Sequence, residues 1–332
     1  MKRAPFIPMG ALALGLLAGL PTVGCKKHAT DAIAVIPKGT THEFWKSVHA
    51  GAEKAAQEMG VNVIWKGPLR EDDREDQVKV VETFTNMHVK GIVLAPLDDT
   101  ALVPAATDAI RAGIPVVAMD SSLKSDDLTS FVATDNYKGG RLAGEHLASL
   151  VAGKGKVMML RYAEGSASTT ERERGFLDAI NFHNGIEVVS SNQYGGVTTE
   201  SAFAASENLL AAHKNADGTL AVQGIFCPNE STAFGMLRAL EDGGLAGKVA
   251  FVGFDSSPKM TDAMAKGHMD ATVVQDPIKM GYLAVKAMVD HLAGRPVPKR
   301  VDTGATLITR ASMTTPEAQA LLNPDFKKWL KE

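Results

Sequence analysis

The sequence predicts an α/β protein with two doubly wound parallel sheets of the Rossmann-like kind. Short apolar runs alternate with amphipathic helical stretches along the chain, and the connections between them are short. The apolar runs show little polar alternation, which is expected of strands that are buried on both faces. The chain has 332 residues, which is enough for two domains of ordinary size, and the strand–helix series restarts near its middle.

Residues 224–255 form the clearest strand–helix–strand unit. A short apolar run is followed by apolar residues at helical spacing and then by a second apolar run. The two expected strands end near Asn229 and at Asp255. Ligands of open α/β sheets bind beyond the carboxyl ends of the strands, so both side chains are candidate ligand contacts. The alternative is an Asx turn at Asn229 and a helix N-cap at Asp255.

The other elements follow in the same alternating order. Strands are expected at 32–36, 61–65, 91–95, 114–119, 131–133, 157–160, 186–190, 220–226 and 271–274. Helices are expected at 44–59, 71–88, 99–112, 136–151, 169–182, 199–212, 258–266 and 278–293. An extended piece at 303–307 precedes a polar tail that is expected to be helical in part.

Composition excludes several classes of protein. The net charge is −3 and no long basic run occurs, which argues against a nucleic-acid partner. The only cysteines, Cys25 and Cys227, cannot make a disulfide framework. The chain shows no metal-spaced histidine cluster, phosphate loop or nucleophile elbow. We therefore expect no catalytic residue, no metal site and no cofactor.

The first 24 residues read as a signal peptide. Lys2 and Arg3 precede an apolar run at 9–20 that is too short to span a bilayer comfortably. Residues 21–25 resemble the lipobox of bacterial lipoproteins, in which the cysteine becomes the lipidated first residue. The expectation is lipidation at Cys25 with a short tether to residue 30; the alternative is plain secretion with cleavage near the same point.

Six short motifs occur in the order found in one known family. They are HEFW at 42–45, MD at 119–120, ERERGF at 171–176, CPNE at 227–230, VGFD at 252–255 and ATVVQ at 271–275. From Asp31 to about Arg310 the chain thus resembles the periplasmic sugar-binding proteins of the ribose-binding type. The resemblance implies two α/β domains joined by a hinge of three crossovers, which close on a sugar and deliver it to an ABC permease.

The resemblance also implies a division of the chain. Crossovers are expected near 134–135, 275–276 and 303–306. The parts that follow are a first domain of 31–134 plus 276–303, a second domain of 135–275 plus 304–313, and a C-terminal tail of 314–332.

The same resemblance implies the ligand contacts. Aromatic rings would stack on the apolar C–H faces of a sugar, aspartates would accept hydroxyl hydrogen bonds, and the planar fork of an arginine would donate them. The expected ligand-binding residues are Lys38, His42, Phe44, Trp45, Asp120, Thr134, Arg172, Asn229, Phe254, Asp255 and Gln275. From the residues alone, Phe44 and Trp45 could instead be a helix core pair, and Arg172 could pair with a glutamate on the helix surface.

Four positions depart from the family pattern. Lys38 replaces a serine, His42 and Ala95 replace asparagines, and Ser121 replaces an arginine. These departures put ribose itself in doubt, so we expect a monosaccharide or related polyol of unspecified identity. Lys38 could meet an anionic substituent or could be solvated at the rim of the cleft.

The function expected is that of an exported, monomeric substrate-binding protein that serves an ABC-type importer. It would lie in the periplasm or on the outer face of the cytoplasmic membrane, and would touch the membrane only through its lipid anchor. Other possibilities are a sensor that presents the sugar to a membrane receptor and a glycoside-processing enzyme that uses Asp120 and Asp255. A lac-repressor-type effector domain shares the fold, but such proteins begin with a helix-turn-helix rather than a signal peptide.

Overall fold

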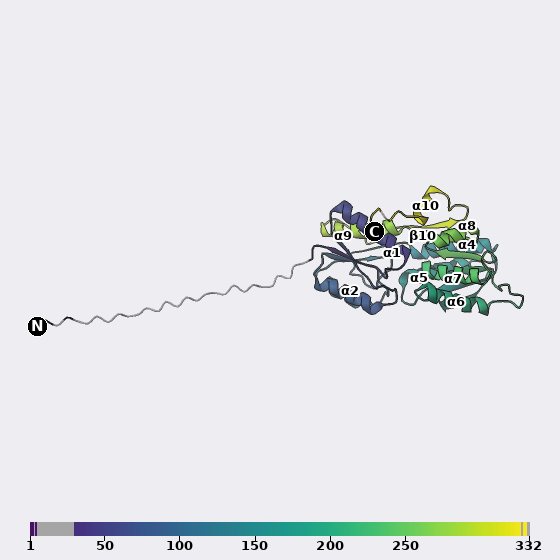
Figure 1. Ribbon diagram of the computed structural model, residues 1–332, viewed down its shortest axis with the longest axis horizontal. Helices are drawn as coiled ribbons and strands as arrows, with labels where there is room; N and C mark the ends of the chain where they lie inside the picture. Colours follow the sequence, from purple (N-terminus) through teal and green to yellow (C-terminus); the bar gives the residue numbers. More distant parts are fainter. Residues whose placement is uncertain (3, 5–29, 327, 331–332) are drawn as a thin grey trace.

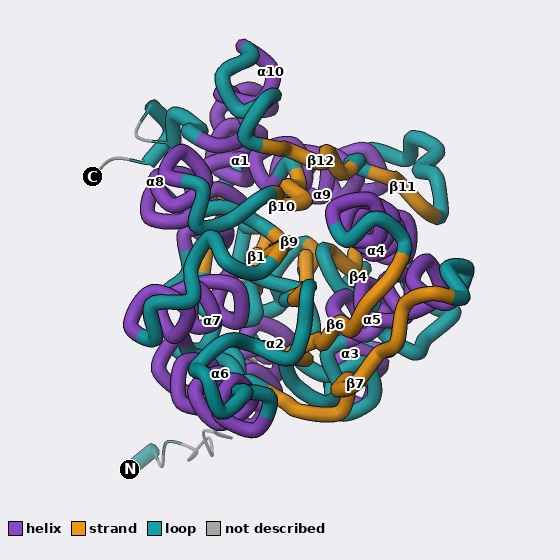
Figure 2. The backbone as a smooth tube through the Cα atoms, turned by 90° about the vertical axis from the view of Figure 1, so that its right-hand side faces the viewer, coloured by secondary structure: helices purple, strands orange, loops and turns teal. Residues whose placement is uncertain are grey.

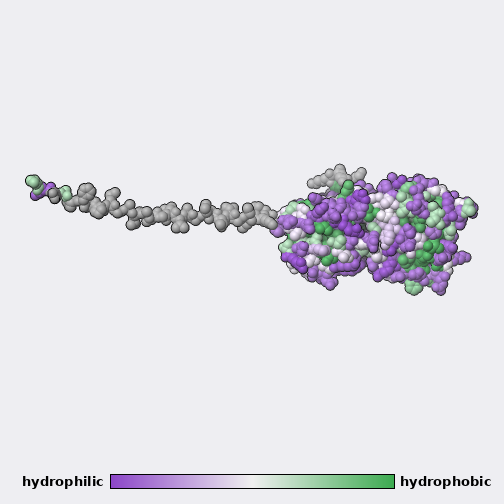
Figure 3. All heavy atoms as spheres, turned by 90° about the horizontal axis from the view of Figure 1, so that it is seen from below, coloured by the Kyte–Doolittle hydropathy of each residue, from purple (hydrophilic) through white to green (hydrophobic). Residues whose placement is uncertain are grey.

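The computed structural model describes residues 1, 2, 4, 30–326 and 328–330. Two lobes lie side by side (Figure 1), and each is built on a six-stranded sheet. Figure 2 views the molecule from the side of the second lobe, with helices packed around the strands. The face in Figure 3 is largely hydrophilic, with smaller hydrophobic areas, as expected when most large apolar side chains pack inside the lobes. Cys25 and nearly all of the expected signal peptide lie outside the described residues.

The first sheet is parallel throughout. Its strands, in spatial order, are β2 (Val63–Trp65), β1 (Ile33–Ile36), β3 (Gly91–Leu94), β4 (Val116–Met119), β5 (Ser130–Ala133) and β11 (Arg300–Asp302). Its helices are α1 (Glu43–Met59), α2 (Arg74–Asn86), α3 (Val103–Arg111) and α9 (Pro277–Leu292). Alternate residues of β1 face α1 with α9 on one side and α2 with α3 on the other, so the sheet is buried on both faces.

The second sheet repeats this order with one difference. Its strands are β7 (Gly185–Tyr194), β6 (Lys154–Arg161), β8 (Gly224–Phe226), β9 (Ala250–Phe254), β10 (Ala271–Gln275) and β12 (Ala305–Thr309). Its helices are α4 (Asn136–Leu150), α5 (Ala167–Asn181), α6 (Thr199–Ala212), α7 (Glu230–Asp242), α8 (Pro258–Lys266) and α10 (Pro316–Leu322). The expectation of purely parallel sheets is wrong at β12, which runs antiparallel to β10.

The chain passes between the sheets at three places. It leaves the first sheet after β5, returns to the first lobe after β10, and crosses once more between β11 and β12. The expected single extended piece at 303–307 is therefore wrong, because Gly304 has a φ of 86° and separates two strands in different sheets. The fold class is confirmed, whereas the assignment of residue ranges to domains remains a prediction.

The C-terminal segment, residues 316–326 and 328–330, bridges the lobes. Ala318 and Leu322 of α10 belong to the core of the second lobe. Further along, the ring of Trp329 lies 5.6 Å from the Nζ of Lys54, which belongs to α1 in the first lobe. The expected partly helical tail is confirmed by α10, and Figure 1 shows it along one edge of the two lobes.

Candidate functional site

The candidate site lies where the carboxyl ends of the strands in the two sheets approach each other. In each sheet the strand order reverses between the first and third strands of its series, which is the point where doubly wound folds bind ligands. A small cavity of about 30 Å³ lies there, here called the central cavity. Nine expected residues line it: Lys38, His42, Phe44, Trp45, Asp120, Arg172, Asn229, Asp255 and Gln275.

Two expected residues do not line the central cavity. Thr134 lies in the first crossover, where its Oγ1 is 3.3 Å from Thr303 Oγ1 and 3.2 Å from the carbonyl oxygen of Gly304. Phe254 is fully buried beneath Arg172, whose guanidinium carbon lies 3.9 Å from the ring centroid. Thr134 thus packs within the crossovers and Phe254 packs beneath Arg172, so neither faces the cavity.

Asp120 and Asp255 occupy equivalent places in the two lobes. Asp120 follows β4 and Asp255 follows β9, the fourth strands of the two series, and both are buried. Their φ values of 63° and 67° are uncommon for residues other than glycine. Unfavourable backbone geometry of this kind gathers at ligand sites, where the surrounding structure enforces it. Both carboxylates are thereby directed toward the space between the lobes.

The helix-cap alternative for Asp255 is wrong. Ser257 caps α8, while Asp255 accepts hydrogen bonds from Gln275 Nε2 at 2.7 Å and from the backbone N–H of Glu230 at 3.2 Å. Burial raises the pKa of the Asp255 carboxyl, and the neighbouring Arg172 opposes that rise. The Asx-turn alternative for Asn229 is wrong, because its side chain instead caps α7 and accepts a hydrogen bond from the backbone N–H of Thr232 at 3.3 Å. Asn229 nevertheless also lines the central cavity.

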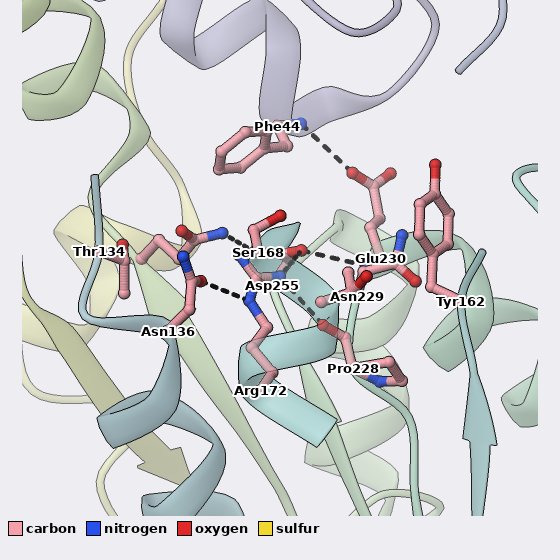
Figure 4. A network of polar contacts seen from close by, with 12 residues as sticks. Phe44, Thr134, Asn136, Tyr162, Ser168, Arg172, Pro228, Asn229, Glu230 and Asp255 are labelled. Atoms are coloured by element: carbon pink, nitrogen blue, oxygen red, sulfur yellow. Dashed lines mark hydrogen bonds and ion pairs between the residues drawn. The ribbon is translucent and has the colours of Figure 1, made fainter. Parts of the chain in front are cut away.

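Arg172 is a buried cation at the centre of the site, with 2% of its surface exposed. Its Nε donates to Asn136 Oδ1 at 2.8 Å and its Nη1 to the carbonyl oxygen of Pro228 at 3.0 Å (Figure 4). The same Nη1 lies 3.6 Å from Asp255 Oδ2. The alternative of a surface salt bridge with a nearby glutamate is therefore wrong.

Helix packing positions Arg172. A Cβ on Gly140 of α4 would lie 1.9 Å from the carbonyl oxygen of Arg172 on α5, so only glycine lets the two helices come this close. The guanidinium then reaches across to the ends of β8 and β9, where its partners lie.

The two aromatic residues of α1 have different environments. Trp45 packs in the core of the first lobe, as the core-pair alternative proposed, and its Nε1 donates to Glu71 at 2.6 Å. Phe44 is half-buried and meets Trp45 edge to face, with 4.9 Å between ring centroids. The backbone N–H of Phe44 donates across the cleft to Glu230 Oε2 at 3.3 Å (Figure 4). Phe44 is thus the ring better placed to meet a ligand.

Glu71 joins the lobes and was not among the expected site residues. Besides Trp45, it accepts a hydrogen bond from Tyr162 Oη at 2.5 Å and lies 2.8 Å from His42 Nδ1. Burial alone would raise the pKa of Glu71, but His42 and Lys38 outweigh burial and lower it to about 2. Burial would lower the pKa of His42, but Glu71 outweighs it and raises that pKa to about 9. The pair is therefore an imidazolium–carboxylate ion pair at neutral pH.

Lys38 is buried, so the alternative of a solvated rim residue is wrong. Its Nζ lies 2.9 Å from Asp120 Oδ2 and 3.0 Å from Ser168 Oγ of the opposite lobe. The backbone N–H of Ser168 in turn donates to Ser121 Oγ at 3.0 Å. This second cross-lobe cluster contains two of the positions that depart from the family pattern, Lys38 and Ser121.

Glu230 and Gln275 add acceptor capacity to the site. Burial raises the pKa of Glu230 to about 7, and the nearby Asp255 adds to the effect while His42 opposes it. In the described part of the chain, Gln275 Oε1 is the only buried side-chain polar atom without a hydrogen-bond partner. Buried polar atoms are nearly always satisfied, so this oxygen is a candidate acceptor for a ligand hydroxyl.

Five residues of the central cavity were not predicted from the sequence: Glu71, Tyr162, Ser168, Thr169 and Glu230. All of them lie after the carboxyl end of a strand or in the first turn of the helix that follows. The rule that singled out Asp255 could therefore have found them, although it would also have selected many loop residues outside the site.

Comparison with known proteins identifies the class to which this fold and site belong. Residues 33–296 match the family model of the periplasmic binding protein domain. This match covers most of the chain, so the protein belongs to the periplasmic binding protein family, whose members are solute-binding proteins rather than enzymes.

Individual relatives bind sugars. The chain is 30% identical over 292 residues to the ribose import binding protein of Salmonella typhimurium, covering 87% of this chain and 94% of the relative. It is 31% identical to the D-allose-binding periplasmic protein of Escherichia coli, covering 86% and 92%. An ABC transporter solute binding protein of Agrobacterium vitis with bound D-fucose is 36% identical, with a TM-score of 0.82 over 88% of this chain and 99% of that one.

Within residues 1, 2, 4, 30–326 and 328–330, no helix is both long and apolar enough to cross a membrane.

Proposed function

We propose that this protein captures a monosaccharide or related polyol between its lobes and delivers it to an ABC-type importer. The observation that carries the proposal is the central cavity, which combines an aromatic ring, two aspartates, an arginine and an unpartnered amide oxygen. Sugars present apolar C–H faces and a rim of hydroxyl groups, and these are the surfaces that such residues bind. The sugar-binding relatives support the same ligand class.

Each contact has an expected role. Phe44 would cover one C–H face, while Asp120 and Asp255 would accept hydroxyl hydrogen bonds from opposite lobes. Arg172 would donate to ring or hydroxyl oxygens, and Gln275 Oε1 would accept a further hydroxyl hydrogen bond. Hydrogen bonds between charged groups and neutral hydroxyls are shorter and stronger than those between neutral partners, so a few of them can fix the orientation of the ligand.

Binding would be coupled to movement of the lobes about the three crossovers. The lobes are joined across the cleft by Tyr162–Glu71, Lys38–Ser168 and Phe44–Glu230 hydrogen bonds. The central cavity of about 30 Å³ has room for one or two water molecules. A monosaccharide therefore requires the lobes to open and its contacts to replace some of these bonds.

A thermal-shift screen tests the proposal. The full chain would be melted with D-ribose, D-allose, D-fucose, other pentoses and hexoses, sugar acids and polyols. A ligand at a hundred times its dissociation constant stabilises the folded state by about 2.7 kcal/mol. At least one sugar should raise the melting temperature, with calorimetric titration confirming one site. No response to any of these compounds would contradict a sugar-binding function.

Export to the outside of the cytoplasmic membrane, with a lipid anchor at Cys25, forms part of the proposal. The apolar run at 9–20 followed by Gly24 and Cys25 supports it. Replacing Cys25 with serine is expected to move the protein from the membrane fraction to the soluble fraction of cells that express it. If the unmodified protein is already soluble after export, the lipid anchor is wrong, while export and sugar binding are unaffected.

A further inference from the structure

A second and larger cavity adjoins the candidate sugar site. Its volume is about 520 Å³, which falls within the range of roughly 300–1,000 Å³ for small-molecule sites. It shares Phe44, Asp255 and Gln275 with the central cavity, so the two spaces lie on either side of the same three residues. We call it the roofed cavity, because residues 321–326 of the C-terminal segment close one side of it.

The roof is held by both lobes. Leu322 is buried in the core of the second lobe, and Leu321 packs against that core. After residues 323–326 the segment reaches the first lobe, where Trp329 lies beside Lys54 of α1. These residues follow the part of the chain, 33–296, that matches the family. The roof of this cavity is therefore formed by a segment that the family match does not cover, while its other walls lie within the match.

The lining of the roofed cavity combines polar and apolar side chains. Asp255 and Gln275 are polar groups that it shares with the sugar site, and Glu43, Asn323 and Asp325 add further polar groups elsewhere. Apolar surface comes from aromatic, leucine and proline side chains: Phe44, Pro258, Leu321, Leu322, Pro324 and Phe326. Gln275 Oε1, the buried acceptor without a partner, belongs to the residue that separates the two spaces. A compound that fits both would have a hydroxyl-rich end and an apolar end.

We propose that the ligand is a glycoside, with its sugar ring in the central cavity and its apolar aglycone in the roofed cavity. This inference rests on the proposed sugar-binding function and narrows its substrate class. The observation that carries it is that the two cavities adjoin and share three lining residues, Phe44, Asp255 and Gln275. An aromatic aglycone is the best match, because the half-buried rings of Phe44 and Phe326 both line the cavity.

Calorimetric titration of the full chain tests this inference. The probes are D-ribose, D-allose and D-fucose together with the methyl and phenyl β-glycosides of each. For the sugar that binds, the phenyl glycoside is expected to bind about tenfold more tightly than the methyl glycoside, or better, because burial of the extra ring removes apolar surface from water. The measured quantity is the ratio of the two dissociation constants.

Two variants of the roof and one control locate the effect. Leu321→Asp places a charge in the roof, and Phe326→Ala removes a ring from it with less risk to the core. Leu150→Asp makes the same change as the first variant at an exposed position of α4. The ratio should fall toward one in the two roof variants and stay unchanged in the control. Thermal melts establish that each variant is folded at the titration temperature.

The outcomes separate the inference from the function on which it rests. If free sugars bind and phenyl glycosides bind no more tightly than methyl glycosides, the inference is overturned while sugar binding stands. A phenyl preference that survives in both roof variants also overturns it, since the aglycone then lies elsewhere. If neither sugars nor glycosides bind, both proposals fail. A phenyl preference lost in Phe326→Ala and kept in Leu150→Asp supports the roofed cavity as the aglycone site.

Discussion

At the scale of single residues, buried charges of both signs dominate the site. Lys38 is paired with Asp120, Arg172 with Asp255, and His42 with Glu71. Each pair is costly to desolvate and is stabilised only by close geometry and further hydrogen bonds. A ligand hydroxyl that enters between such partners exchanges one hydrogen bond for another, so binding need not leave a buried charge without a partner.

Arg172 and Asp255 give the most direct test of the ligand contacts. A hydrogen bond to a charged group contributes on the order of 1.5–3 kcal/mol. Since each 1.4 kcal/mol is a tenfold change in affinity, Arg172→Ala or Asp255→Ala should weaken sugar binding by about 10- to 150-fold. Calorimetric titration with the sugar found by screening measures the change.

A neighbouring arginine provides the control. Arg174 lies two residues after Arg172 on α5, where it is exposed and pairs with Glu171. Arg174→Ala should leave the affinity unchanged. Arg172→Ala should also lower the melting temperature, because Asp255 would remain buried without its cation. Near-normal affinity in both Arg172→Ala and Asp255→Ala would remove these residues from the list of ligand contacts.

The His42–Glu71 pair predicts how stability depends on pH. The pKa of His42 is raised to about 9 from an ordinary value of 6.5, so its stabilisation is complete below pH 6.5 and is lost as the pH rises through 9. The pKa of Glu71 is lowered to about 2 from an ordinary value of 4.5, so its stabilisation is complete above pH 4.5 and is lost as the pH falls through 2. Thermal melts between pH 6.5 and 9 should therefore show stability falling as the pH rises.

Two substitutions separate the groups responsible. His42→Asn, which keeps a polar side chain but cannot titrate, should flatten the dependence between pH 6.5 and 9. Glu230 has a pKa raised to about 7 from 4.5, so it destabilises the fold as the pH rises between those values. Glu230→Gln should flatten that lower range and leave the upper one. An unchanged slope above pH 6.5 in His42→Asn would show that His42 is not the titrating group.

At the scale of elements, the close contact of α4 with α5 links packing to the site. A Cβ on Gly140 would overlap the carbonyl oxygen of Arg172 at 1.9 Å, and backbone cannot move aside as a side chain can. Gly140→Ala should destabilise the protein by about 3 kcal/mol, at the upper end of what overpacking costs, and should weaken sugar binding by displacing Arg172. Denaturant unfolding and calorimetric titration measure the two effects.

Gly139→Ala is the comparison, because it adds the same methyl group one residue earlier. Its Cβ would lie 3.0 Å from the nearest atom of the Phe254 ring, a less severe overlap with a side chain rather than with backbone. It should cost less stability than Gly140→Ala. Equal costs for the two variants would contradict the special role of the Gly140 contact.

The elements themselves were largely predictable from local patterns. Buried parallel strands give uninterrupted apolar runs, and helices with one apolar face give apolar residues at regular helical spacing. The helices α6 and α8 accordingly begin and end at the predicted residues. The antiparallel pairing of β12 was not predictable, because it depends on where the third crossover turns. The position of the C-terminal segment on α1 depends on contacts distant in sequence, and no local pattern encodes these.

The candidate site shows the same limit at the level of residues. Asp120 and Asp255 were predictable because they directly follow apolar runs. Glu71 lies at the expected start of the helix 71–88, yet it accepts a hydrogen bond across the cleft from Tyr162 and pairs with His42 of its own lobe. Its partners are distant in the sequence, so the cluster around Glu71 cannot be predicted from the sequence until the fold is known.

At the scale of the whole molecule, two lobes and three crossovers make a hinge, and we predict that ligand binding shifts the lobes from open to closed. Hinge residues absorb the change in backbone dihedral angles while each lobe stays rigid. A sugar that contacts both lobes stabilises the closed arrangement more than the open one, and so shifts the population toward it. Small-angle scattering should give a smaller radius of gyration at saturating sugar than without it.

Hydrogen bonds between the lobes should favour the closed arrangement, as the ligand does. Tyr162→Phe removes the hydrogen bond to Glu71 while keeping the ring, so the protein without sugar should open further and its radius of gyration should rise. Sugar affinity should fall modestly, because more of the binding energy is needed to close the lobes. Tyr194→Phe makes the same change on the exposed part of β7 and should alter neither quantity. Identical scattering profiles with and without saturating sugar, in the native chain and in Tyr162→Phe, would mean that the lobes do not move on binding.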